Sequence, residues 1–350
     1  MNPKDDQLQP DFAPLADWLL GPIRLALMDA AMELELPDLL TKTGDPDKLA
    51  SRLKVHRQNL CLFLDALTGL GLTEKEDGFY YNTPLADRYL RRDRETWLGE
   101  MLHNLRNIQH RNLDNMVELI RSGPSELKGE KRLESEEQWK NFAGHLINYQ
   151  KSGLARLAAD IAESLPEFPH VKKMLDLGGG PGLAGMAILQ RHPRLEGVLC
   201  DMPSMISVAR EQAQAKGLQG RMTYISGDYN QVDLGESYDL IWTSHALYYV
   251  QNFSHFFSRI YNSLNPGGVF LSLHEGLCNE RTFPPYHVLA RISLALEGQD
   301  VSFSQGFIAE KMRESGFAKI DSQSLELSMG PVWLDIARKS ETIFSAPNPG

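Results

Sequence analysis

A glycine-rich segment between two apolar runs contains the first residues that could do chemistry. Apolar residues 174–177 lead into Gly178-Gly179-Gly180-Pro181-Gly182, and apolar side chains then recur at helical spacing. A second apolar run, residues 198–200, ends at Asp201, nineteen residues after Gly182. Nucleotide-binding βαβ units place the carboxylate that binds a ribose at about this distance. The segment therefore predicts a strand, a glycine turn, a helix and a second strand that together bind a cofactor with a ribose.

Glycine spacing alone leaves the class of cofactor open. Gly180, Gly182 and Gly185 match the G-x-G-x-x-G spacing of a dinucleotide site, in which a pyrophosphate meets a helix N-terminus. Two further glycines, however, separate the strand from Gly180. Asp176 stands just before the turn, where a carboxylate would repel a pyrophosphate and suit a cationic ligand such as S-adenosylmethionine. A tight turn without any ligand is the third interpretation.

The rest of the C-terminal half supplies elements that can position such a site. Strand patterns alternate with helical patterns, which predicts a parallel sheet covered by helices on both faces, with two final strands as an antiparallel pair. The expected strands after the glycine segment are 222–225, 238–243, 269–273, 318–326 and 331–337, and the expected helices are 203–216, 253–264, 284–297 and 305–315.

The N-terminal half has the element order of a winged helix-turn-helix. We expect a helix over 15–40 that Pro37 ends or kinks, a short helix around Leu49, a longer one over 55–70, and a hairpin. DNA binding is the ordinary function of this arrangement. Residues 1–100, however, hold 12 basic and 18 acidic side chains, and the would-be recognition helix has one broad apolar face. This pattern indicates that the helix packs against other parts of the protein and does not recognise DNA.

The composition argues against nucleic-acid binding, a disulfide or metal framework, and membrane insertion. The chain has 350 residues, 42% of them hydrophobic, and a net charge of −10, which argues against a nucleic-acid backbone as the main partner. The three cysteines lie far apart, so no metal or disulfide framework is expected. No apolar run is long enough for a membrane span. We expect a cytoplasmic protein whose residues 1–14 form a loose arm.

The combined motifs resemble the cofactor site of class I S-adenosylmethionine-dependent methyltransferases. These motifs are D-x-G-G-G-x-G from Asp176, Gly227-Asp228-Tyr229 after the third strand, and Asn265-Pro266-Gly267-Gly268 before the fifth. With the N-terminal half included, residues 15–340 resemble the O-methyltransferases that comprise plant caffeic acid and acetylserotonin enzymes and bacterial polyketide and phenazine enzymes.

The resemblance implies an α/β fold: a Rossmann-like seven-stranded sheet preceded by a mostly helical winged-helix domain through which the chain dimerises. The expected boundaries are 15–95 for the dimerisation domain, 96–164 for bridging helices and 165–350 for the methyltransferase domain. The cofactor would be S-adenosylmethionine. Carried over by position, the residues expected to bind it are Asp176, Gly178, Gly180, Gly182, Asp201, Met202, Gly227, Asp228, Tyr229 and Ser244.

The sequence departs from the family at the catalytic base. Plant members carry a histidine nine residues after the acidic residue of strand four, and counting from Asp239 this position holds Tyr248. The nearby histidines are His245 and His274, the latter beside Glu275. We expect one of the two histidines to act as base, since histidine can take a phenol's proton at neutral pH, and Tyr248 to orient the acceptor.

His103, His145 and Tyr149 lie on the bridging helices and are candidates for the acceptor pocket. The activity implied is methyl transfer to a small aromatic or polycyclic acceptor, with oxygen as the expected nucleophile and nitrogen or carbon as possible ones. The alternative is a protein of the same fold that binds the cofactor without transferring methyl, as a sensor or a non-methylating tailoring enzyme.

Overall fold

A computed structural model describes residues 12–124 and 136–341, with the side chains of residues 136–138 left out. The chain divides into two compact units, Met1–Gly99 and Glu100–Gly350. Most of the arm expected over residues 1–14 lies outside the described residues. No helix in the described ranges is long and apolar enough to cross a membrane.

The N-terminal unit has the predicted order of helices and hairpin. The hairpin strands pair antiparallel, Thr73 opposite Asn82. The elements are α1 (Ala13–Leu19), α2 (Gly21–Glu33), α3 (Leu36–Leu40), α4 (Pro46–Leu53), α5 (Arg57–Gly69), β1 (Thr73–Glu76), β2 (Phe79–Asn82) and α6 (Pro84–Tyr89).

The single helix expected over residues 15–40 is wrong, because the chain forms three helices there. The backbone leaves α2 at Glu35, which has a left-handed φ of 52°. Pro37, expected to end a helix, lies in the first turn of α3. A proline is tolerated in a first turn because the N–H that it lacks would have no partner within the helix.

The sheet of the C-terminal unit has seven strands in the order β5-β4-β3-β6-β7-β9-β8, which confirms the predicted fold class. The first five are parallel, and β9 runs antiparallel to both β7 and β8. Their bounds are β3 (Lys173–Leu177), β4 (Glu196–Asp201), β5 (Met222–Ser226), β6 (Tyr238–Ser244), β7 (Leu264–His274), β8 (Lys319–Leu327) and β9 (Gly330–Arg338).

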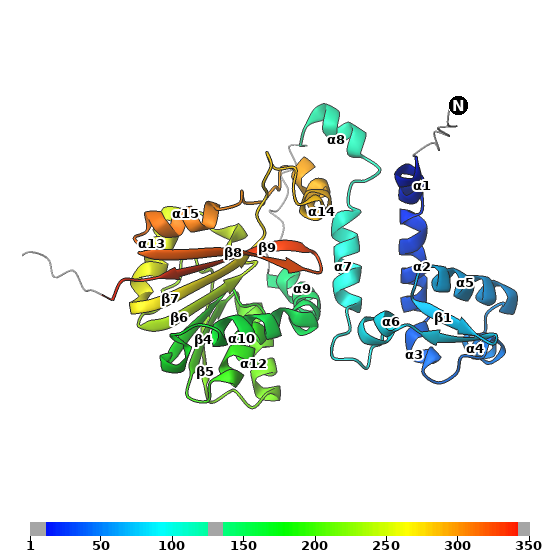
Figure 1. Ribbon diagram of the computed structural model, residues 1–350, viewed down its shortest axis with the longest axis horizontal. Coiled ribbons are helices and arrows are strands. Elements are labelled where there is room, and N and C mark those ends of the chain that lie inside the picture. The colour runs from blue at the N-terminus through cyan, green and yellow to red at the C-terminus, as the bar shows by residue number, and fades with distance from the viewer. Residues whose placement is uncertain (1–11, 125–135, 342–350) are drawn as a thin grey trace, which may run out of the picture. The chain divides into compact units, whose positions relative to one another are not determined.

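Helices cover both faces of this sheet (Figure 1). One apolar core packs α10, α11 and α12 on the sheet, and a second packs α13 and α15 on the opposite face. The helices are α7 (Gly99–Gln109), α8 (Met116–Ser122), α9 (Glu136–Tyr149), α10 (Ala155–Glu163), α11 (Leu183–Arg191), α12 (Pro203–Ala215), α13 (Phe253–Ser263), α14 (Pro285–Leu296) and α15 (Phe307–Glu314).

The bridging segment is expected to contain two helices, over residues 96–121 and 137–164, and both are interrupted. The first is divided into α7 and α8. In the second, a π-helical turn over Gln150–Leu154 separates α9 from α10, and Gly153 within it has a φ of 156°. Since π-turns inside helices often occur at functional sites, this interruption is relevant to the site described below.

The order of strands creates a switch point between β3 and β6. From β3 the chain moves outward to β4 and β5, then returns to place β6 on the other side of β3. The loops after β3 and β6 therefore diverge. Open α/β sheets bind their ligands in the crevice that forms there, outside the carboxyl ends of the strands.

We predict that α5 is a packing helix. Its Leu64 is fully buried whereas Leu62, on the same helix, is 62% exposed. Leu64→Ala should lower the free energy of unfolding by about 2–5 kcal/mol because it leaves a cavity. The matched Leu62→Ala variant should change it by less than about 0.5 kcal/mol. Denaturant unfolding of both variants measures this, and equal effects would show that α5 does not pack as described.

Candidate active site

The glycine loop turns sharply at the end of β3. Gly178, Gly180 and Gly182 have φ angles of 65°, 58° and 76°, in the left-handed region that glycine adopts without strain. Gly182 is also the N-cap of α11, where an added Cβ would lie 2.5 Å from Leu199 Cδ1. Backbone conformation and close packing therefore both require glycine at position 182.

Asp176 lies beneath this loop and does not have the exposed position expected of a cofactor ligand. Its side chain is buried, and its Oδ2 accepts a hydrogen bond of 3.1 Å from the Gly185 amide of α11. Burial raises the pKa of Asp176 to about 7, although the Gly185 amide lowers it. This geometry argues against direct contact of Asp176 with a cofactor and gives it the role of holding the loop and helix on the strand.

Asp201 links the end of β4 to the glycine loop. Its Oδ2 accepts a hydrogen bond of 2.7 Å from the Gly180 amide, and its Oδ1 accepts one of 2.7 Å from the Met202 amide. The Gly227 amide, after β5, donates to the Asp201 carbonyl at 2.9 Å. Four expected cofactor residues are thus brought together at one edge of the sheet.

The remaining expected cofactor residues differ in placement. Asp228 is half-buried, and its Oδ1 accepts hydrogen bonds from the backbone and side chain of Asn230, both 2.8 Å. Ser244 is half-buried at the carboxyl end of β6. Tyr229 is 9% exposed and donates to the Ala246 carbonyl at 2.8 Å. Tyr229 therefore supports the loop after β6 from within the core, and the expectation that it binds the cofactor does not fit this position.

The charges along this edge suit S-adenosylmethionine. Apart from the buried Asp176, the expected cofactor residues include two carboxylic acids, Asp201 and Asp228, and no basic side chain. A pyrophosphate would meet acidic groups here. A sulfonium and an ammonium would find a favourable potential, and the Asp201 carboxylate can accept hydrogen bonds from ribose hydroxyls.

His245 is the centre of a second group of side chains, on the loop after β6. Its backbone is left-handed, with a φ of 50°. The Nδ1 atom lies 3.2 Å from Glu275 Oε2, and the Nε2 atom lies 3.0 Å from the hydroxyl of Tyr149. An ionised carboxylate can only accept hydrogen bonds, so Nδ1 carries the proton and Nε2 keeps its lone pair. Nε2 of His245 therefore accepts the hydrogen bond of the Tyr149 hydroxyl.

Glu275 is held ionised by three partners. Tyr248 donates its hydroxyl to Glu275 Oε2, and Arg291 Nη2 lies 3.1 Å from Oε1. Burial alone would raise the pKa of Glu275, but His245, Arg291 and Tyr248 together hold it well below its ordinary value. The sequence reasoning missed Arg291 and the part played by Glu275, because α14 reaches this loop only in the folded chain.

The two tyrosines of this cluster remain protonated. Burial raises the pKa of Tyr149, and burial together with Glu275 raises that of Tyr248 well above 10. Neither can serve as a base at neutral pH. Tyr248 was expected to orient the acceptor, and its hydroxyl here binds Glu275 and lies 3.3 Å from Arg291 Nη2.

The expectation that His274 could be the base does not fit the structure. Its Nε2 accepts hydrogen bonds from the Ala246 and Leu247 amides, both 3.0 Å, and its Nδ1 lies 3.1 Å from Ser272 Oγ. Burial lowers its pKa to about 3. With its lone pair occupied, His274 cannot take a proton from an acceptor. It instead holds the loop that carries His245.

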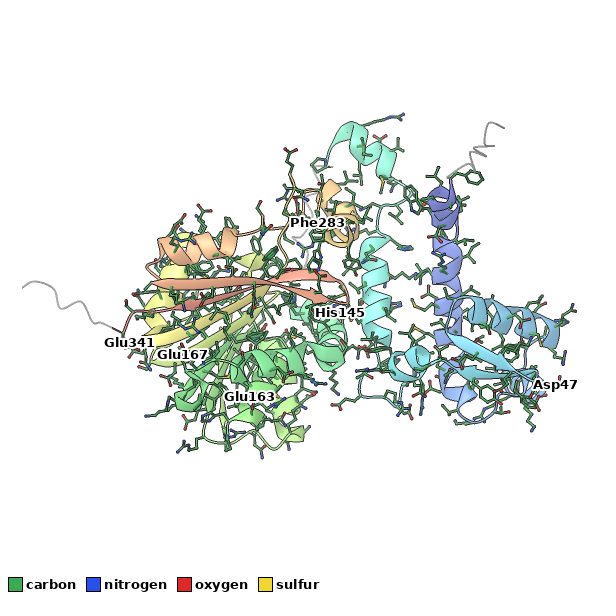
Figure 2. The ribbon with its side chains drawn as sticks, viewed as in Figure 1. Asp47, His145, Glu163, Glu167, Phe283 and Glu341 are labelled. Carbon is green, nitrogen blue, oxygen red and sulfur yellow. The ribbon has the colours of Figure 1, made fainter. Side chains whose placement is uncertain are left out.

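The residues expected to line an acceptor pocket are not all brought together. Tyr149 reaches His245, as described. His145, labelled on α9 in Figure 2, is buried and stacks on Phe142 with 4.1 Å between ring centroids. Burial lowers its pKa to about 4. His103 is exposed on α7 and pairs with Asn107, one helical turn away.

Gln150 also reaches the site, although no motif in the sequence marks it. It follows Tyr149 at the start of the π-helical turn, and only 6% of it is exposed. Its amide hydrogen-bonds to both sides of the glycine loop, at Gly179 and Ala184.

The fold and the site together define a class I methyltransferase. Comparison with known proteins agrees. Residues 174–268 match a methyltransferase domain, and residues 17–92 match an O-methyltransferase dimerisation domain.

Two relatives and one solved structure extend over most of the chain. The N,N-dimethyltransferase OxyT of Streptomyces rimosus is 26% identical, covering 89% of this chain and 92% of its own. The tetracenomycin polyketide synthesis 8-O-methyltransferase TcmO of Streptomyces glaucescens is 24% identical, covering 89% and 91%. The structure of human N-acetylserotonin methyltransferase in complex with S-adenosylmethionine superimposes with a TM-score of 0.74 at 23% identity, covering 97% of this chain and all of that one.

The chain is an S-adenosylmethionine-dependent methyltransferase with an N-terminal O-methyltransferase dimerisation domain. This confirms the family, the fold class and the cofactor expected from the sequence. The comparisons give no support to a cofactor-binding protein that does not transfer methyl.

We predict that His274 makes stability depend on pH. Between about pH 3, its folded pKa, and about pH 6.5, its unfolded pKa, only the unfolded chain binds a proton at this residue. The free energy of unfolding should therefore fall as the pH drops through this window. The His274→Gln variant should lower that slope by about 1.4 kcal/mol per pH unit.

Denaturant unfolding between these pH values measures the slope. His170→Gln, which changes an exposed histidine, is the matched control and should keep the wild-type slope. Equal slopes for wild type and His274→Gln would contradict a neutral, buried His274.

Proposed function

We propose that the protein methylates a phenolic hydroxyl of a small aromatic or polycyclic acceptor, with His245 as general base. The observation that carries the proposal is the hydrogen bond of 3.0 Å between His245 Nε2 and the hydroxyl of Tyr149. A phenol of the protein itself thus already meets the basic nitrogen, and an acceptor phenol in the same position would find the same partner. The O-methylating relative TcmO supports this choice of nucleophile.

In this proposal each side chain of the cluster has a separate task. His245 Nε2 takes the proton of the acceptor hydroxyl as the oxygen becomes nucleophilic. Glu275 keeps the proton on Nδ1 and stabilises the imidazolium that forms, while Tyr248 and Arg291 orient Glu275. S-adenosylmethionine supplies the electrophilic methyl group when it is bound. The protein contributes orientation of the acceptor oxygen and removal of its proton.

Aromatic side chains next to this cluster favour an aromatic acceptor. Trp139 on α9 contacts Tyr249 edge to face, with 5.7 Å between centroids, and Phe142 lies 6.5 Å from Trp139. Tyr249 lies 6.3 Å from Tyr248 and is 38% exposed. Such rings offer edges and faces on which a planar acceptor can stack.

Nitrogen is the second candidate nucleophile. The relative OxyT is named as an N,N-dimethyltransferase and matches along nearly the whole chain. Methylation of an amine gives a cationic ammonium product. The same base can then take the proton that this product must lose. The cluster therefore accommodates N-methylation, while the phenol contact at Nε2 favours oxygen.

We expect His245→Ala to lower kcat on phenolic acceptors by about 10²- to 10⁴-fold, the usual contribution of a general base. Affinity for S-adenosylhomocysteine should not change. Production of S-adenosylhomocysteine with a panel of phenols and arylamines measures the first quantity, and calorimetry measures the second. His255→Ala, which changes an exposed histidine on α13, is the matched control. An undiminished rate for His245→Ala would exclude the histidine base.

We further propose that the enzyme is a cytoplasmic homodimer with the domain boundaries expected from the sequence, 15–95, 96–164 and 165–350. The match to a dimerisation domain supports self-association, and the three described cysteines are free thiols, as in a reducing compartment. In the N-terminal unit, Trp18 and Leu19 of α1 are 71% and 77% exposed. Apolar side chains this exposed on one helix are typical of a surface that a partner covers.

Sedimentation velocity tests the dimer. The wild type should sediment as a dimer, and the double variant Trp18→Glu with Leu19→Glu should sediment as a monomer because the charges cannot be buried in an apolar interface. Circular dichroism should be unchanged in the variant, since both side chains are exposed in the unit. A dimeric variant would exclude α1 from the interface.

A further inference from the structure

Gln150 joins the π-helical turn to both ends of the glycine loop. Its Nε2 donates a hydrogen bond of 3.0 Å to the Gly179 carbonyl, and its Oε1 accepts one of 3.1 Å from the Ala184 amide in the first turn of α11. A primary amide supplies the donor and the acceptor that this arrangement requires at any pH. Only 6% of Gln150 is exposed, so water cannot readily replace either bond.

The glycines of this loop have no side chains of their own to hold it in place. The backbone amides of Gly178 and Gly180 are bonded to the neighbouring strand β4, at the Cys200 carbonyl and the Asp201 carboxylate. A Cβ added to Gly180 would lie 3.3 Å from Leu146 Cδ1 and 3.8 Å from Gln150 Nε2, so α9 and the π-helical turn pack directly on the loop. Gln150 therefore holds the loop at glycines, whose backbone conformation is the least restricted by their own side chains.

The residue before Gln150 contacts the proposed base. Tyr149, the last residue of α9, bonds to His245 Nε2, while Gln150 bonds to the loop. Two consecutive residues thus reach the proposed base and the glycine loop. The helix bears the glycine Gly153 at a φ of 156° just beyond them.

We propose that Gln150 is a positioning residue that holds the glycine loop in the conformation that receives S-adenosylmethionine, and that it sets cofactor affinity without taking part in proton transfer. This inference rests on the glycine loop being the cofactor site and does not depend on the identity of the acceptor.

Two variants separate its hydrogen bonds from its volume. Gln150→Met keeps the length of the side chain and removes both bonds. We expect it to weaken binding of S-adenosylhomocysteine by about 10-fold or more, since two buried polar groups lose their partners. Gln150→Glu keeps the bond from the Ala184 amide but places a carboxylate against the Gly179 carbonyl, so at about pH 8 its affinity should fall further.

Lowering the pH should restore the affinity for S-adenosylhomocysteine only in the Gln150→Glu variant. Once protonated, the introduced carboxyl group would donate to the Gly179 carbonyl again, so the affinity of Gln150→Glu, relative to wild type, should recover toward about pH 5.5. Gln150→Met should show no such recovery. Asp176 and Asp201, the titratable groups packed against the loop, are present in all three proteins, so their titration cancels in the ratio.

Calorimetry with S-adenosylhomocysteine measures these affinities, and steady-state kinetics with a phenol that the enzyme methylates provides a second readout. Gln190→Met, which makes the same change at an exposed glutamine of α11, is the matched control and should leave cofactor affinity unchanged. Asp201→Asn tests the site itself. If Asp201→Asn weakens binding and the Gln150 variants do not, the role of Gln150 is excluded. If none of them weakens binding, the cofactor does not bind at this loop.

Discussion

The hydrogen bond between the Gly185 amide and the buried carboxyl of Asp176 connects the functional parts of the C-terminal unit. It joins α11 to β3. The contact thereby sets the distance between the end of the strand and the start of the helix, which the glycine loop has to span. An added Cβ at Gly185 would lie 2.5 Å from Asp176 Oδ2, so helix and strand approach more closely than any other side chain would permit. The position of the loop, and through it the cofactor site, follows from this packing.

The loop that carries His245, the proposed base, is supported in a similar way. His245 has a left-handed backbone that costs free energy, and the loop that carries it is stabilised by His274, which accepts two successive amides. The imidazole of His245 is then oriented by Glu275, whose own charge is balanced by Arg291. The cluster therefore combines a carboxylate that polarises the base with a cation that keeps the carboxylate in place. Charge neutrality of the supporting pair allows the cluster to lie in a largely buried position.

Much of the site could be read from residue order because strand ends are marked by local patterns. Gly178, Asp201 and Asp228 each follow an apolar run, and the carboxyl ends of parallel strands share one edge of a sheet. Local patterns do not report burial, however. Asp176 and Tyr229 have the residue types expected of ligands, yet both lie in the core, where they hold backbone groups in place.

The sequence by itself determined the fold class, the cofactor class and the order of the domains, because these depend on periodicity and on motifs within short segments. Only the tertiary structure decided which of the candidate histidines can act as a base. His245 and His274 follow neighbouring strands, and their difference arises from their partners: Nε2 of His245 accepts from the Tyr149 hydroxyl, a position that an acceptor hydroxyl can take, while two backbone amides occupy Nε2 of His274. Hydrogen-bond partners contributed by separate elements have no signature in the order of residues, so proton chemistry was decided by packing.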